Sequence, residues 1–174
     1  LLRRPMVQIP RIRTALTLAD VQRLLPTLPS QRLLSRGGIE RGELRLGLAG
    51  DRLALFATVL DAVPQTTGIP WESSVVEIFA YQDERSTKGQ VFLIPTVGTV
   101  PARMQHVDQR GLPITEGGQL LTRMITGGWE VAALIPAAAL RVACFNQPFL
   151  IEVAATGVNA ADGFRLRASW LSVP

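Results

Sequence analysis

Two side chains that could bind a ligand stand at the start of one predicted strand. Trp71 precedes residues 75–81, which alternate so that Glu77 and Tyr81 lie on one face with two apolar residues. An ionised carboxylate among apolar side chains has to be paired, hydrogen-bonded or used for binding. The indole of Trp71 offers a flat apolar surface beside that carboxylate. We therefore treat this strand and its lead-in as the first candidate for a binding site.

The residue types that most enzymes use for catalysis are scarce in this chain. His106 is the single histidine, and no Gly-x-Ser-x-Gly sequence provides a serine nucleophile. The glycine pairs lie in predicted turns without the spacing of a phosphate-binding loop. Glu77 could form a carboxylate pair with Glu72 or Glu130 for glycosidic cleavage, but any sandwich of this size holds several carboxylates. We expect a protein that is not an enzyme.

The balance of charge and hydropathy excludes further classes of function. The formal net charge is +4, yet the basic residues are scattered along the chain and do not alternate with aromatic residues, so we expect no nucleic acid partner. A hydrophobic content of 47% excludes a disordered chain. The apolar runs are far shorter than the roughly 20 residues of a transmembrane helix. We therefore expect membrane association only through a partner.

Cysteine content restricts the covalent and metal chemistry. The single cysteine, Cys144, cannot form an internal disulfide. One cysteine and one histidine are also too few for a zinc or iron site built on those residue types.

The first part of the chain, residues 1–42, predicts an extension packed on the main domain. Thr17 followed by Asp20 is typical of a capped helix start, and the apolar residues that follow predict a short helix that ends at Pro26. Residues 26–42 contain two prolines and three glycines, counting Pro26 itself, and predict a loop or crossing segment.

From residue 43 to residue 174 the sequence alternates as a succession of strands does. Residues 53–60 and 75–81 are apolar on both faces or nearly so, which predicts central strands. Gly127 and Gly128 predict a tight hairpin between two alternating runs. The remaining predicted strands are residues 43–49, 90–97, 101–107, 149–156 and 164–170. The fold class is therefore all-β, an antiparallel two-sheet sandwich with a short N-terminal helix.

Several of these motifs resemble those of the family 9 carbohydrate-binding modules, a β-sandwich group within the wider DOMON-like superfamily. The likeness covers roughly residues 43–171. Its motifs are Pro70-Trp71-Glu72, Val76-Glu77-Ile78-Phe79, Asp51-Arg52-Leu53-Ala54-Leu55 through Asp61, and the run from Gly128 to Pro136. The resemblance implies a non-catalytic sugar-binding module and a periplasmic or extracellular location.

The resemblance also implies roles for individual residues. Trp71 would form one wall of a sugar slot and Glu77 would bind hydroxyl groups on its floor. Tyr81 and Arg103 complete the predicted ligand-binding set. The neighbouring strand departs from the family pattern, because Phe92 and Ile94, or Leu93 and Pro95 if the register shifts by one, stand where the family has an arginine and an asparagine.

Other readings of the same residues stay open. Trp71 could be a lid that binds nothing, since tryptophan is rarely wholly buried. Glu77 could pair with Arg103 or Arg123 and hold two strands together. Trp129 fits a core position by periodicity.

Two cofactors also stay open, although we expect none. Calcium, which some members of the family carry, would need several oxygen ligands, and only Asp61 or Asp83 with Glu84 lie near. Haem, which some members of the superfamily bind, would use Met104 and His106, two residues apart on one strand face.

The sequence thus supports two main hypotheses for function. The first is a carbohydrate-binding module that stacks a sugar ring on Trp71. The alternative is a sandwich without a sugar site that serves as an accessory or structural subunit, docked on a larger and possibly membrane-associated protein complex. The apolar Phe92 and Ile94 favour the alternative, whereas Trp71 together with Glu77 favours the first.

Overall fold

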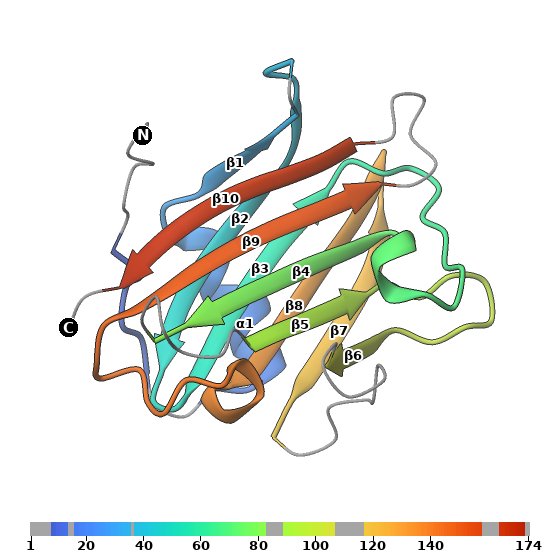
Figure 1. The fold of residues 1–174 in the computed structure, drawn as a ribbon. Helices are drawn as coiled ribbons and strands as arrows, with labels where there is room; N and C mark the ends of the chain where they lie inside the picture. Colours follow the sequence, from blue (N-terminus) through green and yellow to red (C-terminus); the bar gives the residue numbers. More distant parts are fainter. Residues whose placement is uncertain are drawn as a thin grey trace.

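Two five-stranded sheets face each other in the computed structural model of the chain (Figure 1). The structure describes residues 8–13, 16–35, 37–82, 89–106, 117–157 and 164–172, the last range by its backbone alone. The named strands pair antiparallel with their neighbours in both sheets. The predicted all-β sandwich is confirmed.

The order of neighbouring strands differs from their order in the sequence in both sheets. The first sheet, which we call sheet A, has the order β1 (Gln31–Leu34), β2 (Glu40–Ala49), β3 (Arg52–Val59), β8 (Gly128–Pro136) and β7 (Gln119–Ile125). The second, sheet B, has the order β10 (Phe164–Ser172), β9 (Phe149–Gly157), β4 (Val75–Tyr81), β5 (Gly89–Ile94) and β6 (Arg103–His106). Short 3-10 helices connect strands or follow the α-helix. Within the described residues these are η1 (Leu25–Thr27), η2 (Pro70–Glu72) and η3 (Ala137–Leu140).

The core lies between the sheets and is built by alternation. On the middle strands, Leu55 of β3 and Ile78 of β4 are fully buried and belong to one apolar cluster. Trp129 of β8 belongs to the same cluster, so its predicted core position is confirmed. Burying each such side chain contributes about 1.5–3 kcal/mol relative to leaving it in water. Both strands predicted to be central are the middle strands of their sheets.

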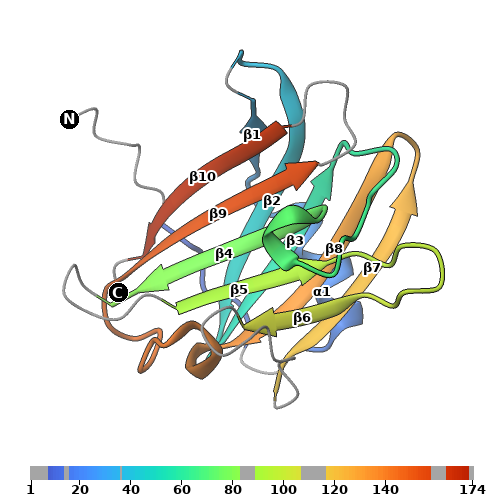
Figure 2. The same ribbon diagram turned by 45° about the vertical axis from the view of Figure 1, so that its right-hand side comes forward.

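One α-helix occurs in the described part of the chain: α1 (Leu18–Leu24) covers the outer face of sheet A, on the side away from sheet B (Figure 2). Its start is a capping box: Asp20 N donates to Thr17 Oγ1 at 3.2 Å, and Thr17 N donates to Asp20 Oδ2 at 3.1 Å. This bond from the Thr17 backbone, together with Arg23, lowers the pKa of Asp20 below its ordinary value. The predicted capped helix is confirmed.

Strand β1 was not predicted from the sequence. Residues 26–42 contain β1 and the beginning of β2, where a loop or crossing segment was predicted. Only Leu33 of the four β1 residues is fully buried, so this strand is too short to show alternation. Leu33 pairs with Gly42 of β2. At Gly42 the backbones of β2 and β3 are so close that a Cβ atom on residue 42 would lie 2.0 Å from Thr58 O, so only glycine fits there.

Candidate functional site

Trp71 lies on η2, at the end of the segment that leads from β3 to β4. Pro70 occupies the start of this 3-10 turn and restricts its φ angle. Ser73 fixes the turn from its other end, because its hydroxyl donates to Ile69 O at 2.9 Å and accepts from Thr67 N at 3.2 Å. The Trp71 side chain is nevertheless 56% exposed. The indole is thus held on a fixed backbone with one part open to solvent.

A buried hydrogen bond holds the same segment against the sandwich. Ser74 Oγ donates to Asp61 Oδ2 at 2.6 Å, and both residues are buried. Ser74 also bonds Gln65 twice, since its hydroxyl accepts from Gln65 N at 2.9 Å and its backbone N donates to Gln65 O at 2.8 Å. Asp61 therefore has a structural partner, and it lies in no group of three or more metal-binding residues among those described.

Glu77 lies in the middle of the outer face of sheet B. It pairs with Phe92 of β5 on one side and with Ala154 of β9 on the other. Only 1% of Glu77 is exposed, and Gln90 Nε2 donates to Glu77 Oε2 at 3.4 Å. Next to it, Val75, Phe92 and Ile94 form a fully buried apolar cluster on the same outer face. The carboxylate is therefore set in an apolar surface, as its place in the sequence indicated.

Arg103 connects β6 with the segment that carries Trp71. Its Nη2 donates to Thr66 Oγ1 at 3.0 Å, and Thr66 Oγ1 lies 3.4 Å from Ser73 Oγ. The Nη1 atom of Arg103 is buried and has no hydrogen-bond partner among the residues that the structure describes. Arg103 thus keeps an unused donor close to the turn that bears Trp71.

Tyr81 lies at the other end of β4 from Trp71. The seven residues from Val75 to Tyr81 span roughly 20 Å, at a rise of about 3.3 Å from each residue to the next. The alternation that placed Tyr81 on the face of Glu77 is correct, but a single sugar ring would not reach from Trp71 to Tyr81. The structure links Arg103 through Thr66 and Ser73 to the turn that carries Trp71, and it places Glu77 on the outer face of sheet B.

Arg123, one of the predicted partners of Glu77, forms its ion pair elsewhere. Its Nε atom lies 2.6 Å from Glu130 Oε1, on sheet A. This hydrogen bond, reinforced by the negative charge of Glu130, raises the pKa of Arg123.

The two residues considered for haem occupy different environments. Met104 is 5% exposed and packs in the core between the sheets. His106 is half-buried, and its pKa is lowered by this burial and by the positive charge of Arg141. Asp83 and Glu84, considered for calcium, lie outside the described residues.

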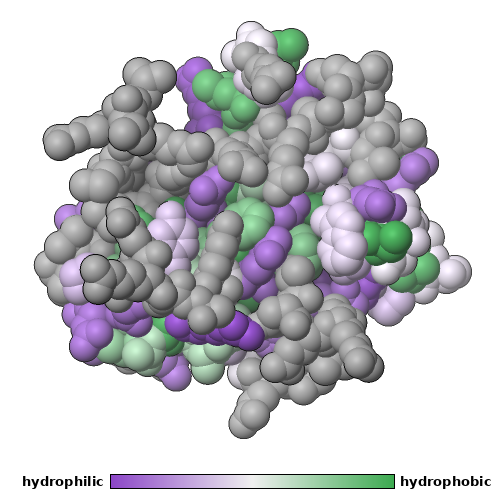
Figure 3. Space-filling view, viewed as in Figure 1, coloured by the Kyte–Doolittle hydropathy of each residue, from purple (hydrophilic) through white to green (hydrophobic). Residues whose placement is uncertain are grey.

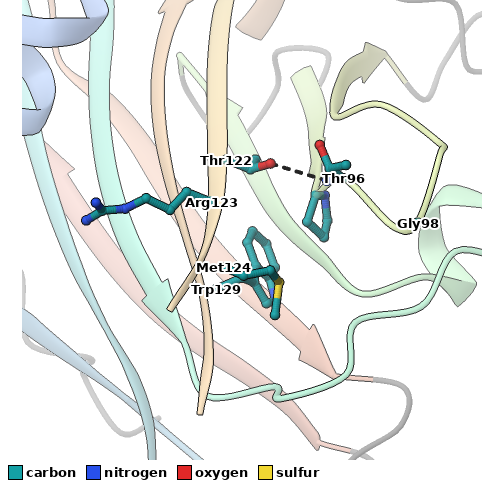
Figure 4. A pocket seen from close by; sticks show the side chains of 7 residues that line it. Thr96, Gly98, Thr122, Arg123, Met124 and Trp129 are labelled. Atoms are coloured by element: carbon teal, nitrogen blue, oxygen red, sulfur yellow. Dashed lines mark hydrogen bonds between the residues drawn. The ribbon is translucent and has the colours of Figure 1, made fainter. Parts of the chain in front are cut away.

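A cleft that the sequence did not predict lies between sheet A and the turn that follows β5 (Figure 4). Its volume is about 340 Å³, and it is lined by Pro95, Thr96, Gly98, Thr122, Arg123, Met124 and Trp129. Trp129 was predicted only as a core residue. The opening beside it depends on how far the two sheets stand apart, which no local pattern records.

No helix among the described residues has the length and apolar character needed to cross a membrane. No protein-family model matches the sequence, and no curated protein matches it either.

Several solved structures match the fold. A protein from Bacteroides uniformis, provisionally assigned as carbohydrate-binding, is 15% identical with a TM-score of 0.67, and the match covers 97% of this chain and 90% of that chain. A family 9 carbohydrate-binding module from Caldicellulosiruptor kristjanssonii, solved with cellotriose, is 11% identical with a TM-score of 0.63, covering 92% of this chain and 82% of that chain.

The third match is a family 9 module from the same organism solved with glucose. It is 13% identical with a TM-score of 0.55, and the match covers 95% of this chain and 85% of that chain. Identities this low establish a shared fold and leave function to the site itself. The chain has the β-sandwich fold of the family 9 carbohydrate-binding modules.

Proposed function

We propose that this chain is a non-catalytic binding module that stacks a sugar ring on the exposed face of Trp71. The observation that carries the proposal is the 56% exposure of an indole on a turn whose backbone is fixed by Pro70 and Ser73. An aromatic face held in this way loses little conformational entropy when a ligand covers it. Pyranose rings have apolar faces that suit such a surface.

Polar contacts in this proposal come from the residues around Thr66. Arg103 Nη1 is an unused donor on a charged side chain, and a bond from a guanidinium to a hydroxyl is stronger than a neutral one. Glu77 is almost wholly buried, so we assign it the role of orienting Gln90, whose Nε2 donates a hydrogen bond to it. The periplasmic or extracellular location belongs to the same proposal.

The matching structures support the choice of ligand. Two of them are family 9 carbohydrate-binding modules that were solved with cellotriose and with glucose. Both ligands are therefore suitable probes for this chain. A site with one exposed aromatic wall is expected to bind weakly, with a Kd of about 1 mM, which corresponds to about 4 kcal/mol.

A second candidate function is docking to a protein partner, and one observation favours it. Leu60, Val63 and Ile69 are exposed apolar residues on the same segment as Trp71. Figure 3 shows hydrophobic and neutral side chains gathered at the end of the molecule where η2 lies. An exposed apolar patch of this kind is typical of interaction surfaces.

Calorimetric titration distinguishes the two functions. Cellotriose and glucose are added to the protein, to Trp71→Ala and to Leu121→Ala, a control in which an exposed apolar residue of β7 is shortened instead. We expect saturable heat for the protein and the control and none for Trp71→Ala. If millimolar sugar gives no saturable heat with the unmodified protein, the sugar proposal is wrong and docking is the better account.

A further inference from the structure

The cleft at Trp129 has the properties of a second binding site. Met124 and Trp129 face each other across the β7–β8 pair, and both line the cleft. Met124 is 52% exposed, so the cleft opens to solvent on that side. Its volume of about 340 Å³ lies within the usual range of small-molecule sites.

The indole N–H of Trp129 lacks a hydrogen-bond acceptor among the described residues. Trp129 is 0% exposed, and its Nε1 atom is buried without a hydrogen-bond partner among the described residues. Buried indole N–H groups normally find an acceptor, and leaving one unpaired costs free energy. Because indole N–H can only donate, the missing partner has to be an acceptor.

The two threonine hydroxyls of the cleft also have hydrogens that can donate to an acceptor. Thr122 Oγ1 accepts from Thr96 N at 3.2 Å, and Thr96 Oγ1 accepts from Ala102 N at 3.0 Å. Each hydroxyl hydrogen is then left to donate. The polar side chains at the wall of the cleft thus offer donors more readily than acceptors.

Arg123 is the charged residue among those that line the cleft, and its charge points away from the cleft. Figure 4 shows the Arg123 side chain extending away from Trp129 and Met124. Its guanidinium is bonded to Glu130 at 2.6 Å. A carboxylate or phosphate ligand would therefore lack a counter-charge.

We propose that this cleft binds an uncharged, ring-sized molecule with a mainly apolar surface and an acceptor oxygen, such as a cyclic ketone, ether or ester. Trp129 Nε1 donates a hydrogen bond to the acceptor oxygen, the ring packs against Pro95 and Met124, and the Met124 side chain moves to admit the ligand. Methionine suits this role because its side chain is flexible and polarisable. The site does not depend on Trp71.

Indole N–H resonances in a ¹H–¹⁵N spectrum test this proposal, with cyclohexanone as the probe. The chain has three tryptophans, and Trp129→Phe identifies the resonance of Trp129. If that variant does not fold, Trp71→Phe and Trp170→Phe identify it by elimination. We expect cyclohexanone to shift the Trp129 resonance downfield and saturably, while the Trp71 resonance stays in place.

Two variants show whether the cleft itself is responsible. Thr122→Val removes a hydroxyl from the cleft and is expected to weaken the response about threefold or more, whereas Thr126→Val, at an exposed threonine of the hairpin turn, leaves it unchanged. Trp71→Ala also keeps the response, so failure of the sugar proposal would not affect it. A Trp129 resonance that does not shift, or that shifts linearly together with the other two, overturns the proposal.

Discussion

Arg103 Nη2 donates a hydrogen bond of 3.0 Å to Thr66 Oγ1, and this bond joins the edge strand β6 to the segment that carries Trp71. Thr66 Oγ1 in turn lies 3.4 Å from Ser73 Oγ, directly after the turn of η2. One short chain of polar contacts therefore connects the guanidinium to the turn that carries the exposed indole. Binding at Trp71 should depend on these contacts as well as on the indole itself.

Replacing Thr66 by valine tests this dependence. The Thr66→Val variant removes the acceptor of Arg103 Nη2 and leaves a partly buried guanidinium with one bond fewer. We expect a loss of about 1–2 kcal/mol in the free energy of unfolding, measured in urea, and a several-fold weaker affinity for cellotriose. Thr67→Val is the matched control, because Thr67 is exposed and its hydroxyl bonds only to nearby Ile69. Equal sugar affinities in the two variants would show that Arg103 does not position the site.

The bond between Ser74 and Asp61 predicts a larger effect on stability. Ser74→Ala removes the 2.6 Å bond to the buried carboxylate and the acceptor of Gln65 N. We expect the free energy of unfolding to fall by about 2–3 kcal/mol, because a buried charged group loses a donor. Ser30→Ala, at an exposed serine, provides the baseline in the same urea titration. A loss as small as that of Ser30→Ala would mean that solvent replaces the bond.

The stability of the fold should fall as the pH drops below neutrality, and His106 predicts why. Burial first, and then the charge of Arg141, lower the pKa of His106 below its ordinary value of 6.5. Below pH 6.5 the unfolded chain therefore binds a proton that the folded chain does not yet bind, so stability decreases with falling pH until the lower pKa of the folded state is passed.

His106→Gln isolates this contribution, because His106 is the only histidine. Urea midpoints are measured between pH 7.5 and pH 5.5 for both proteins. We expect the protein to lose stability relative to its pH 7.5 value by more than the variant does. Parallel curves would show that His106 titrates alike in the folded and unfolded chains.

Local signals in the sequence were sufficient to predict most of the fold. The alternation of residues 75–81 and the glycines at 127 and 128 determine strand and turn without help from distant residues. Strand β1 was not predicted, because a single buried side chain, Leu33, is too few to show an alternation of buried and exposed residues.

The candidate site was harder to predict, because it depends on distances between elements. Alternation placed Glu77 and Tyr81 on one face, but it gave neither the near-complete burial of Glu77 nor the roughly 20 Å between Tyr81 and the Trp71 end of β4. The cleft at Trp129 is set by the separation of two sheets, to which residues far apart in the sequence contribute. The exposure of Trp71, in contrast, follows from a turn that its own proline helps to form.

The claim that Trp71 is the surface on which a sugar stacks is tested most directly by its own indole resonance. Cellotriose is titrated into ¹⁵N-labelled protein, and the resonance of Trp71 is assigned with Trp71→Phe. The account predicts that the Trp71 signal shifts saturably with millimolar cellotriose while the signal of Trp129 stays in place. A Trp71 signal that remains unchanged up to tens of millimolar cellotriose would contradict it.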